Sequence, residues 1–121
     1  MRVAGRYRTV RRRDHAVPGV MPRPILGREQ GLDVRIWAGT EAGPMLLVNA
    51  SRKQGGAVQR NRFRRQVRMA FLKILREAPV RDDLRYVVWV RPGRGASKGC
   101  PFSFHDIESQ LRLALRRWET R

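Results

Sequence analysis

The chain has 121 residues and carries 27 Lys and Arg against 10 Asp and Glu, so its formal net charge is +17 at neutral pH. This length predicts one domain over residues 1–121 and excludes a multidomain enzyme, because a domain usually takes roughly 100–200 residues. Such an excess of positive charge repels itself unless a polyanion neutralises it, and nucleic acid is the commonest polyanion for a basic domain. Arginine supplies 24 of the 27 cations. The planar guanidinium of arginine binds phosphate through paired hydrogen bonds. This composition therefore favours binding to structured RNA or DNA.

Signals for export, membrane insertion and metal binding are missing from the sequence. The basic start at 1–14 is not followed by the apolar stretch of about 7–15 residues that a secretory signal needs, and no run approaches the roughly 20 apolar residues of a membrane span. The single Cys100 cannot form an intramolecular disulfide, and with two histidines it does not make a typical zinc site. We therefore expect a cytoplasmic protein with no membrane partner.

The first thirty residues form a basic segment that contains Pro18, Pro22 and Pro24. Each proline removes a backbone donor and pushes the preceding residue out of the helical region. At most one or two helical turns fit, around Arg11–Val17. Two interpretations stay open for this arm: a solvated, partly disordered tail, or a segment that becomes ordered on RNA.

Two strands are predicted next. Leu32, Val34 and Ile36 alternate with polar or outward residues, which is typical of a half-buried strand. The stretch Thr40–Pro44 reads as a turn, and Met45–Val48 forms a second, more continuous apolar strand. We expect these two strands to pair as a hairpin.

A helix, a third strand and a loop follow. The helical stripe ends before Pro79, and an apolar strand at Tyr86–Val90 is expected in the interior of the sheet because both of its faces are apolar. The glycine-rich stretch Pro92–Pro101 reads as a loop. The residues of the helical stripe are Phe63, Val67, Ala70, Phe71 and Ile74.

The last helix has the clearest start signal in the chain. Ser103 precedes Asp106 by three residues, and Phe102 and Ile107 are spaced to form a hydrophobic staple. The element order is then β-β-α-β-α, and the predicted fold class is α+β, an α/β sandwich of one small sheet with helices. The apolar stripe of this helix comprises Phe104, Ile107, Leu111, Leu115 and Trp118.

Catalytic machinery is not apparent. The acidic residues are scattered among turns, caps and helix ends rather than converging as a metal-dependent nuclease requires. His15 and His105 lie far apart in the sequence, and Cys100 has no neighbouring group that would activate it. We predict no catalytic and no metal-ligating residue.

A basic cluster occupies the junction between the second strand and the first long helix. Asn61, Arg65 and Arg68 stand at i, i+4 and i+7, so they share one helix face, with Arg64 at its edge. The preceding Gly55 and Gly56 let the backbone approach a ligand closely, and the open N–H groups of a helix start favour phosphate. The alternative is that this helix face is simply exposed to solvent and binds nothing. However, its like charges lie within one turn and repel each other, and no glutamate four residues away offsets this repulsion.

This cluster resembles the signature of the bacterial ribonuclease P protein family. The resemblance rests on the run Gly55–Phe71 with its Arg60-Asn61-Arg62 triplet, preceded by Val48–Lys53, and it extends over roughly residues 45–118. It implies a small sheet of about four strands packed with helices, and a left-handed β-α-β crossover. The RNA-binding residues that it implies, together with the basic residues around them, are Arg52, Lys53, Arg60, Asn61, Arg62, Arg64, Arg65 and Arg68.

The resemblance further implies a subunit that binds the catalytic RNA of ribonuclease P and the 5′ leader of precursor tRNA, and that helps remove the leader. The RNA and its Mg²⁺ would carry the chemistry. The sequence leaves open whether the holoenzyme is a single or a paired assembly, and we expect a monomeric protein in it. A ribosomal or general RNA-binding protein using the same helix is the alternative function. An autonomous basic nuclease would have to act without any RNA.

Two departures from the family pattern stand out: the first leaves the arginine-rich helix face still more cationic, and the second concerns the leader site. Met69 stands where the family usually has a glutamate, and Asp14 is followed by His15 instead of an aromatic residue. Trp37 lies on the outward face of the first strand, where it either stacks on bases or packs under the N-terminal segment. The expected leader-binding residues are Trp37, Tyr7, Arg11, Arg12 and Arg13.

Overall fold

The computed structural model describes residues 8–9, 20–26, 31–39, 43–77, 85–93, 99 and 102–119. The expected helical turns around Arg11–Val17 and most of the Pro92–Pro101 loop lie outside these residues. No helix in the described ranges is long and apolar enough to cross a membrane. The elements in chain order are β1 (Arg8–Thr9), β2 (Leu32–Ala38), β3 (Gly43–Val48), a short 3-10 helix (Arg52–Gln54), α1 (Ala57–Glu77), β4 (Arg85–Pro92) and α2 (Phe104–Glu119).

The strands form one mixed sheet in the order β1-β3-β4-β2. β4 is parallel to β3, with Leu46 opposite Val88, and antiparallel to β2, with Val34 opposite Val90. The predicted hairpin between β2 and β3 is therefore wrong, because β4 lies between them. β4 is buried from Tyr86 to Val90. An interior position in the sheet suits this strand because both of its apolar faces are then shielded from water. β2 alternates buried with half-buried residues, which suits an edge.

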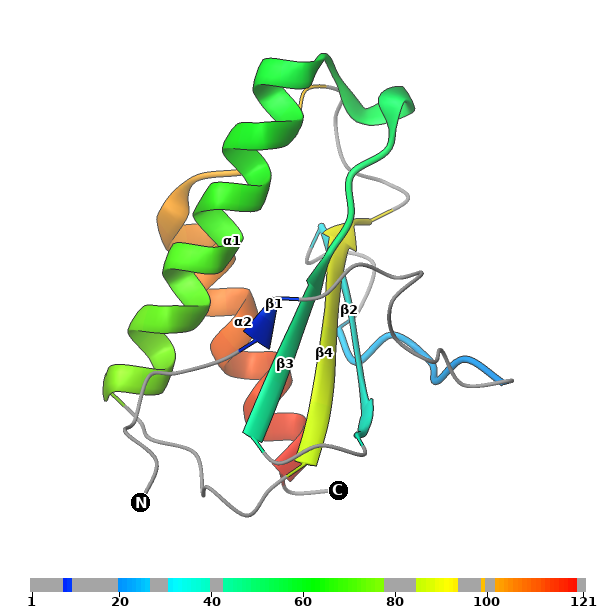
Figure 1. The fold of residues 1–121 in the computed structure, drawn as a ribbon, viewed down its shortest axis with the longest axis vertical. Helices are drawn as coiled ribbons and strands as arrows, with labels where there is room; N and C mark the ends of the chain where they lie inside the picture. Colours follow the sequence, from blue (N-terminus) through cyan, green and yellow to red (C-terminus); the bar gives the residue numbers. More distant parts are fainter. Residues whose placement is uncertain are drawn as a thin grey trace.

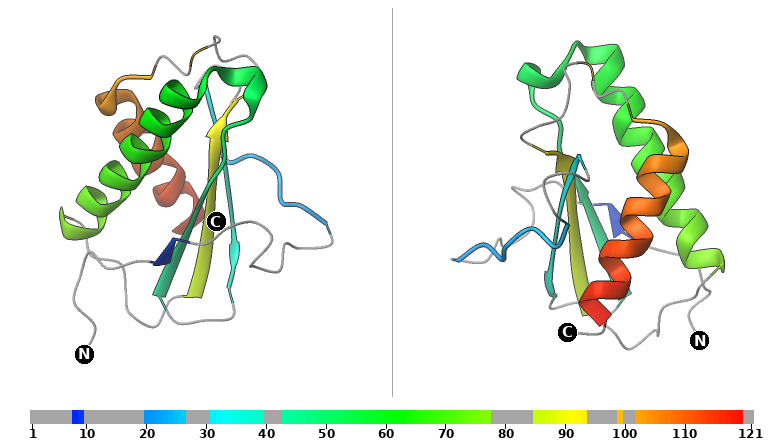
Figure 2. Two further views of the ribbon diagram at one scale, coloured as in Figure 1. Left: turned by 45° about the horizontal axis from the view of Figure 1, so that its top comes forward. Right: turned by 180° about the vertical axis from the view of Figure 1, so that it is seen from behind.

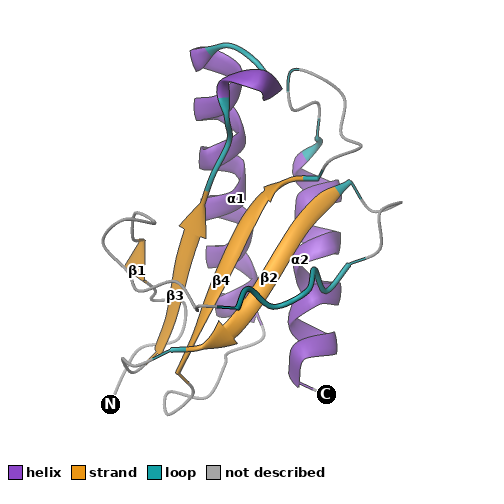
Figure 3. Ribbon diagram, turned by 90° about the vertical axis from the view of Figure 1, so that its right-hand side faces the viewer, coloured by secondary structure: helices purple, strands orange, loops and turns teal. Residues whose placement is uncertain are grey.

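The connection from β3 through α1 to β4 is a left-handed crossover. In Figure 3 both helices lie behind the sheet, β3 and β4 run upward, and β4 stands to the right of β3. The chain thus moves to the left when it is viewed from the side of the helix. This is the sense that the family resemblance implies, although about 98% of such crossovers are right-handed.

Both helices cover the same face of the sheet and form the core with it (Figures 1 and 2). All five residues of the predicted α1 stripe are buried, as is Leu75. α2 contributes Ile107, Leu111, Ala114 and Leu115. The helical periodicity in the sequence therefore identified the packing faces of α1 and α2 correctly.

The predicted start of α2 is confirmed. The Ser103 hydroxyl oxygen accepts a hydrogen bond from the Asp106 backbone N–H at 3.0 Å, which makes Ser103 the N-cap of the helix. Asp106 itself lies in the first turn, where a negative charge is favoured by the helix dipole. Phe102 packs against the same core that contains Ile107.

The face of the sheet away from the helices is also largely covered at β3 and β4. Met45, Leu47, Val87 and Trp89 are buried there, although they do not belong to the core beneath the helices. Residues 20–26 run past β2, where the Ile25 N–H donates to the Val34 carbonyl oxygen at 2.8 Å. On β2 the outward face carries half-buried polar and aromatic side chains.

Candidate nucleic-acid interface

The connection from β3 to α1 is held in place by Gln54. Its Oε1 accepts a hydrogen bond from the Ser51 N–H at 2.9 Å, and its Nε2 donates to the Pro92 carbonyl oxygen at 3.2 Å. The Gln54 carbonyl oxygen accepts from the Gly99 N–H at 2.6 Å. One side chain and its backbone thus join the 3-10 helix, the end of β4 and the following loop, which fixes where α1 begins.

A second glutamine shapes the first turn of α1. The Gln59 Oε1 accepts a hydrogen bond from the Gly56 N–H at 2.9 Å, while the Gly56 carbonyl accepts from the Arg60 N–H at 3.0 Å. This is one half of a capping box, with Gly56 as the N-cap. Gly55 has φ of 145°, and a Cβ on it would lie 2.5 Å from the Gln59 Oε1. Only glycine therefore fits at position 55 without strain.

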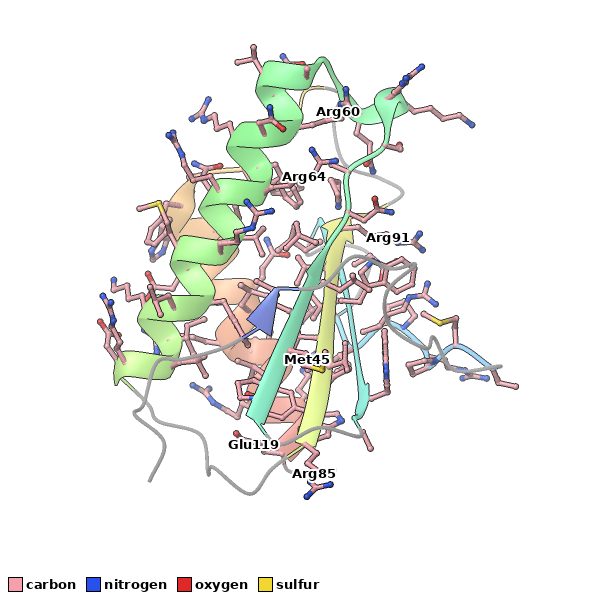
Figure 4. The ribbon with its side chains drawn as sticks, viewed as in Figure 1. Met45, Arg60, Arg64, Arg85, Arg91 and Glu119 are labelled. Atoms are coloured by element: carbon pink, nitrogen blue, oxygen red, sulfur yellow. The ribbon has the colours of Figure 1, made fainter. Side chains whose placement is uncertain are left out.

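Arg64 links α1 to the end of β3. Its Nη1 donates to the Asn61 Oδ1 at 3.2 Å, and its Nη2 donates to the Ala50 carbonyl oxygen at 3.3 Å. Figure 4 shows Arg60 and Arg64 on the side of α1 that faces this connection. Arg64 therefore positions the helix, and it retains further donors because a guanidinium has five.

Arg60 is half-buried in the same corner. Its Nε is buried and has no hydrogen-bond partner among the described residues. Buried polar atoms are usually paired, so this orphaned donor is a feature to be explained.

The eight sequence-predicted RNA-binding residues all lie on the 3-10 helix and the first three turns of α1, a region that we call the junction surface. Arg52 and Lys53 are exposed on the 3-10 helix, while Asn61, Arg62, Arg65 and Arg68 are exposed along the first turns of α1. Arg60 and Arg64 are half-buried between them. The junction surface consists of Arg52, Lys53, Arg60, Asn61, Arg62, Arg64, Arg65 and Arg68.

Charge is compensated at the other end of α1. Lys73 lies 3.1 Å from Glu108 and 4.0 Å from Glu77, and Arg112 pairs with both of these carboxylates. Hydrogen bonds from Arg112 and Lys73 lower the pKa of the Glu108 carboxyl. Glu77 is the one acidic residue of α1. The network thus joins α1 to α2, and the acidic residue of α1 lies at the end away from the junction surface.

Trp37 lies in a second polar and aromatic group, on the outward face of β2 and β4. Its ring meets Trp89 edge-on, with 6.4 Å between ring centroids. The Arg91 guanidinium carbon lies 4.8 Å from the Trp89 ring centroid, and the Arg91 Nε donates to Asp33 at 2.9 Å. Arg35 donates to Asp33 at 3.1 Å and to the Pro22 carbonyl oxygen at 3.2 Å. Trp37 is half-buried, so part of its ring stays accessible.

Sequence reasoning missed several residues that shape these two regions. Gln54 and Gln59 were not singled out, although a glutamine at the third helical position is a known capping signal. Trp89 and Arg91 were predicted only as strand or strand-end residues. Their spacing of two residues indicates that they share one face of the sheet. The other expected leader-binding residues, Tyr7, Arg11, Arg12 and Arg13, lie outside the described residues.

No group of three His, Cys, Asp or Glu that could hold a metal ion occurs in the part of the chain that the structure describes. His105 is exposed at the start of α2. His15 and Cys100 fall outside the described ranges. The described arginines can bind phosphate, and the described aromatic rings can stack on bases.

The fold and the junction surface define a small, arginine-rich α+β protein of the nucleic-acid-binding class. The family model described as Ribonuclease P matches residues 27–119. The chain therefore belongs to the ribonuclease P protein family, the protein subunits of a tRNA-processing ribonucleoprotein. The resemblance noted in the sequence is confirmed.

A solved structure supports the same fold. The chain is similar to the RNase P protein of Staphylococcus aureus, with a TM-score of 0.54, 20% sequence identity, and coverage of 72% of this chain and 73% of that chain. At this identity the likeness concerns the fold alone. The comparison with curated protein sequences gave no match.

Proposed function

We propose that this subunit binds the catalytic RNA of ribonuclease P through the junction surface. The observation that carries the proposal is the concentration of arginines from Arg60 to Arg68 on a helix whose single acidic residue is Glu77, in the last turn. The positive end of the helix dipole lies at the same corner, because α1 begins there. Phosphate is the ligand that satisfies both features.

The 5′ leader of precursor tRNA is the second proposed ligand. Trp37 offers a partly accessible ring on the outward face of the sheet, and Arg35 and Arg91 lie beside it on Asp33. An aromatic side chain with neighbouring arginines suits a single strand, since stacking tolerates any base. Tyr7, Arg11, Arg12 and Arg13 are proposed to add to this surface from the N-terminal arm.

The protein is proposed to assist a reaction that the RNA performs, the Mg²⁺-dependent endonucleolytic removal of the leader in the cytoplasm. We propose that the RNA binds the Mg²⁺, as the family resemblance implies. One copy of the protein in each holoenzyme is proposed. The family match favours this role over that of a ribosomal or general RNA-binding protein.

The test is cleavage of precursor tRNA at low Mg²⁺ by the organism's ribonuclease P RNA, with the protein, without it, and with the protein alone. Strong stimulation of the RNA and no cleavage by the protein alone are expected. Tight RNA binding without stimulation would contradict the proposal and favour a general RNA-binding protein. Cleavage by the protein alone would contradict the assignment of the chemistry to RNA.

A further inference from the structure

A groove lies at the opposite end of the molecule from the junction surface. It has a volume of about 310 Å³ and is lined by Pro22, Arg23, Ile25, Ile36, Arg117 and Trp118. α1 begins at one end of the molecule and α2 ends at the other (Figures 1 and 2), and Arg117 and Trp118 belong to the last turn of α2. A ligand in this groove would therefore not compete with RNA on the junction surface.

Trp118 provides an aromatic wall of the groove and packs against a buried ring. Its ring packs on the buried Tyr86 with 5.1 Å between centroids and an interplanar angle of 36°. Trp118 is itself half-buried. A tryptophan held in this way offers a rigid apolar surface, and ordering it on ligand binding costs little conformational entropy.

Two arginines stand beside the aromatic wall. The Arg117 Nη1 donates to the Ile25 carbonyl oxygen at 3.1 Å, which joins the end of α2 to the segment before β2. Arg23 is exposed at the edge of the groove. An apolar wall with cations at its edge matches a nucleotide, whose base is flat and apolar on its faces and whose phosphate is anionic.

Other occupants fit less well. A second copy of this chain would bring another +17 charge to a surface that already carries Arg23 and Arg117. The volume lies near the lower end of the range of about 300–1,000 Å³ that small-molecule pockets span, so the groove has room for a base and not for a helix. A base can enter only if it is unpaired, which selects a single strand.

We propose that this groove binds one unpaired nucleotide of the 5′ leader of precursor tRNA, with the base against Trp118 and the phosphate on Arg23. The proposal rests on the proposed function, because that function gives the junction surface at the other end to the catalytic RNA. β2 is the edge strand, and its consecutive residues Ile36 and Trp37 point to opposite faces. A leader that passes Trp37 on the outward face would reach the groove around this edge, beyond the point where Ile25 is bonded to Val34.

The first experiment measures the affinity of the free full-length protein for a short, labelled, single-stranded RNA by fluorescence anisotropy. The variants are Trp118→Leu, Trp118→Phe and Arg23→Glu, and the matched control is Arg76→Glu, an exposed arginine at the far end of α1. Loss of stacking predicts about a 5- to 160-fold weaker Kd for Trp118→Leu. Trp118→Phe should bind nearly as well as the unmodified protein, and Arg23→Glu should bind several-fold more weakly than Arg76→Glu.

Unchanged affinity in both Trp118→Leu and Arg23→Glu would overturn the groove as a binding site. Equal losses in Arg23→Glu and Arg76→Glu would also overturn it, since charge alone would then explain them. Arg23 is exposed and outside the core, so its variant tests the proposal even if Trp118→Leu is unstable. None of these outcomes depends on whether the protein stimulates the catalytic RNA, so the groove and the proposed function fail separately.

The second experiment identifies the source of the strand. The holoenzyme is assembled with the unmodified protein or with Arg23→Glu, and KM is measured for precursor tRNAs with a long leader or with a leader of one nucleotide. A several-fold rise in KM is expected for the long leader alone. Equal effects on both substrates, or a loss of affinity for the catalytic RNA instead, would contradict the assignment to the leader.

Discussion

Arg64 donates a hydrogen bond to the carbonyl oxygen of Ala50 at 3.3 Å, although fourteen residues separate the two in sequence. The bond joins the second turn of α1 to the chain that leaves β3. It gives Arg64 a structural role within a cluster that also contains exposed arginines such as Arg62 and Arg65. Two kinds of arginine therefore share the junction surface, and their substitutions should have different effects.

Arg64→Ala should lower the free energy of unfolding by about 0.5–1.5 kcal/mol, the usual net value of a hydrogen bond. It should also weaken RNA binding, because the helix start is no longer fixed to β3. Urea unfolding measures the first effect. Arg62→Ala removes the same charge from an exposed neighbour and should change stability by less than about 0.5 kcal/mol. Equal stability of the two variants would show that the bond to Ala50 contributes nothing.

The paired substitution Arg65→Ala with Arg68→Ala should weaken binding to the catalytic RNA and flatten its salt dependence. Each phosphate contact that is lost should reduce the slope of log K against log salt by about 0.7–0.9. The measurement is a salt titration of affinity, with Arg76→Ala as the control at the other end of α1. A lower affinity with an unchanged slope would show that these arginines do not contact phosphates.

Gly55→Ala should destabilise the protein and disturb the start of α1. A Cβ at position 55 would lie 2.5 Å from the Gln59 Oε1 and 3.1 Å from the Gly99 Cα, at a φ of 145° that disfavours side chains. A strained residue of this kind costs about 1–3 kcal/mol. At Gly56 a Cβ would meet nothing nearer than 4.0 Å, so Gly56→Ala should cost less. Thermal unfolding of the two variants compares them, and a reversed order would contradict this account of the turn.

The Glu108 carboxyl should make stability depend on pH in acid. Its pKa is lowered from the ordinary 4.5 by hydrogen bonds from Arg112 and Lys73, so the folded state favours the ionised form. The stabilisation is complete above pH 4.5 and is lost as the pH falls through the lowered pKa. Glu108→Gln should therefore be less stable than the unmodified protein at pH 7, and the difference should shrink toward pH 3. Urea unfolding at several pH values measures this difference; Glu119→Gln, exposed at the end of α2, is the control.

Local signals in the sequence predicted most of the elements. The stripe that contains Phe63 and Phe71 and the Ser103 cap depend on residues three or four apart, so each is visible in a short window. The pairing of β2 with β4 joins residues such as Val34 and Val90, and no local pattern encodes it. The hairpin expectation failed for this reason. The hand of the crossover was known only through the family resemblance.

The sequence predicted which residues belong to the candidate site, but it did not predict how they are arranged. The spacing of Asn61, Arg65 and Arg68 placed them correctly on an exposed side of α1. It did not reveal that Arg64 binds the Ala50 carbonyl, because that contact depends on where β3 ends. The groove at Trp118 likewise forms only where the segment at Pro22 meets the end of α2. No sequence motif predicts this long-range contact.

The uneven placement of charge along α1 has a kinetic consequence. Five arginines lie between Arg60 and Arg68, whereas Lys73 near the other end is paired with Glu77 and Glu108. The helix therefore has a strongly positive end and a nearly neutral one, and the field of an RNA exerts a torque on it before contact. Such steering acts on the association rate. The protein should thus arrive at its RNA with the junction surface already turned toward the phosphates.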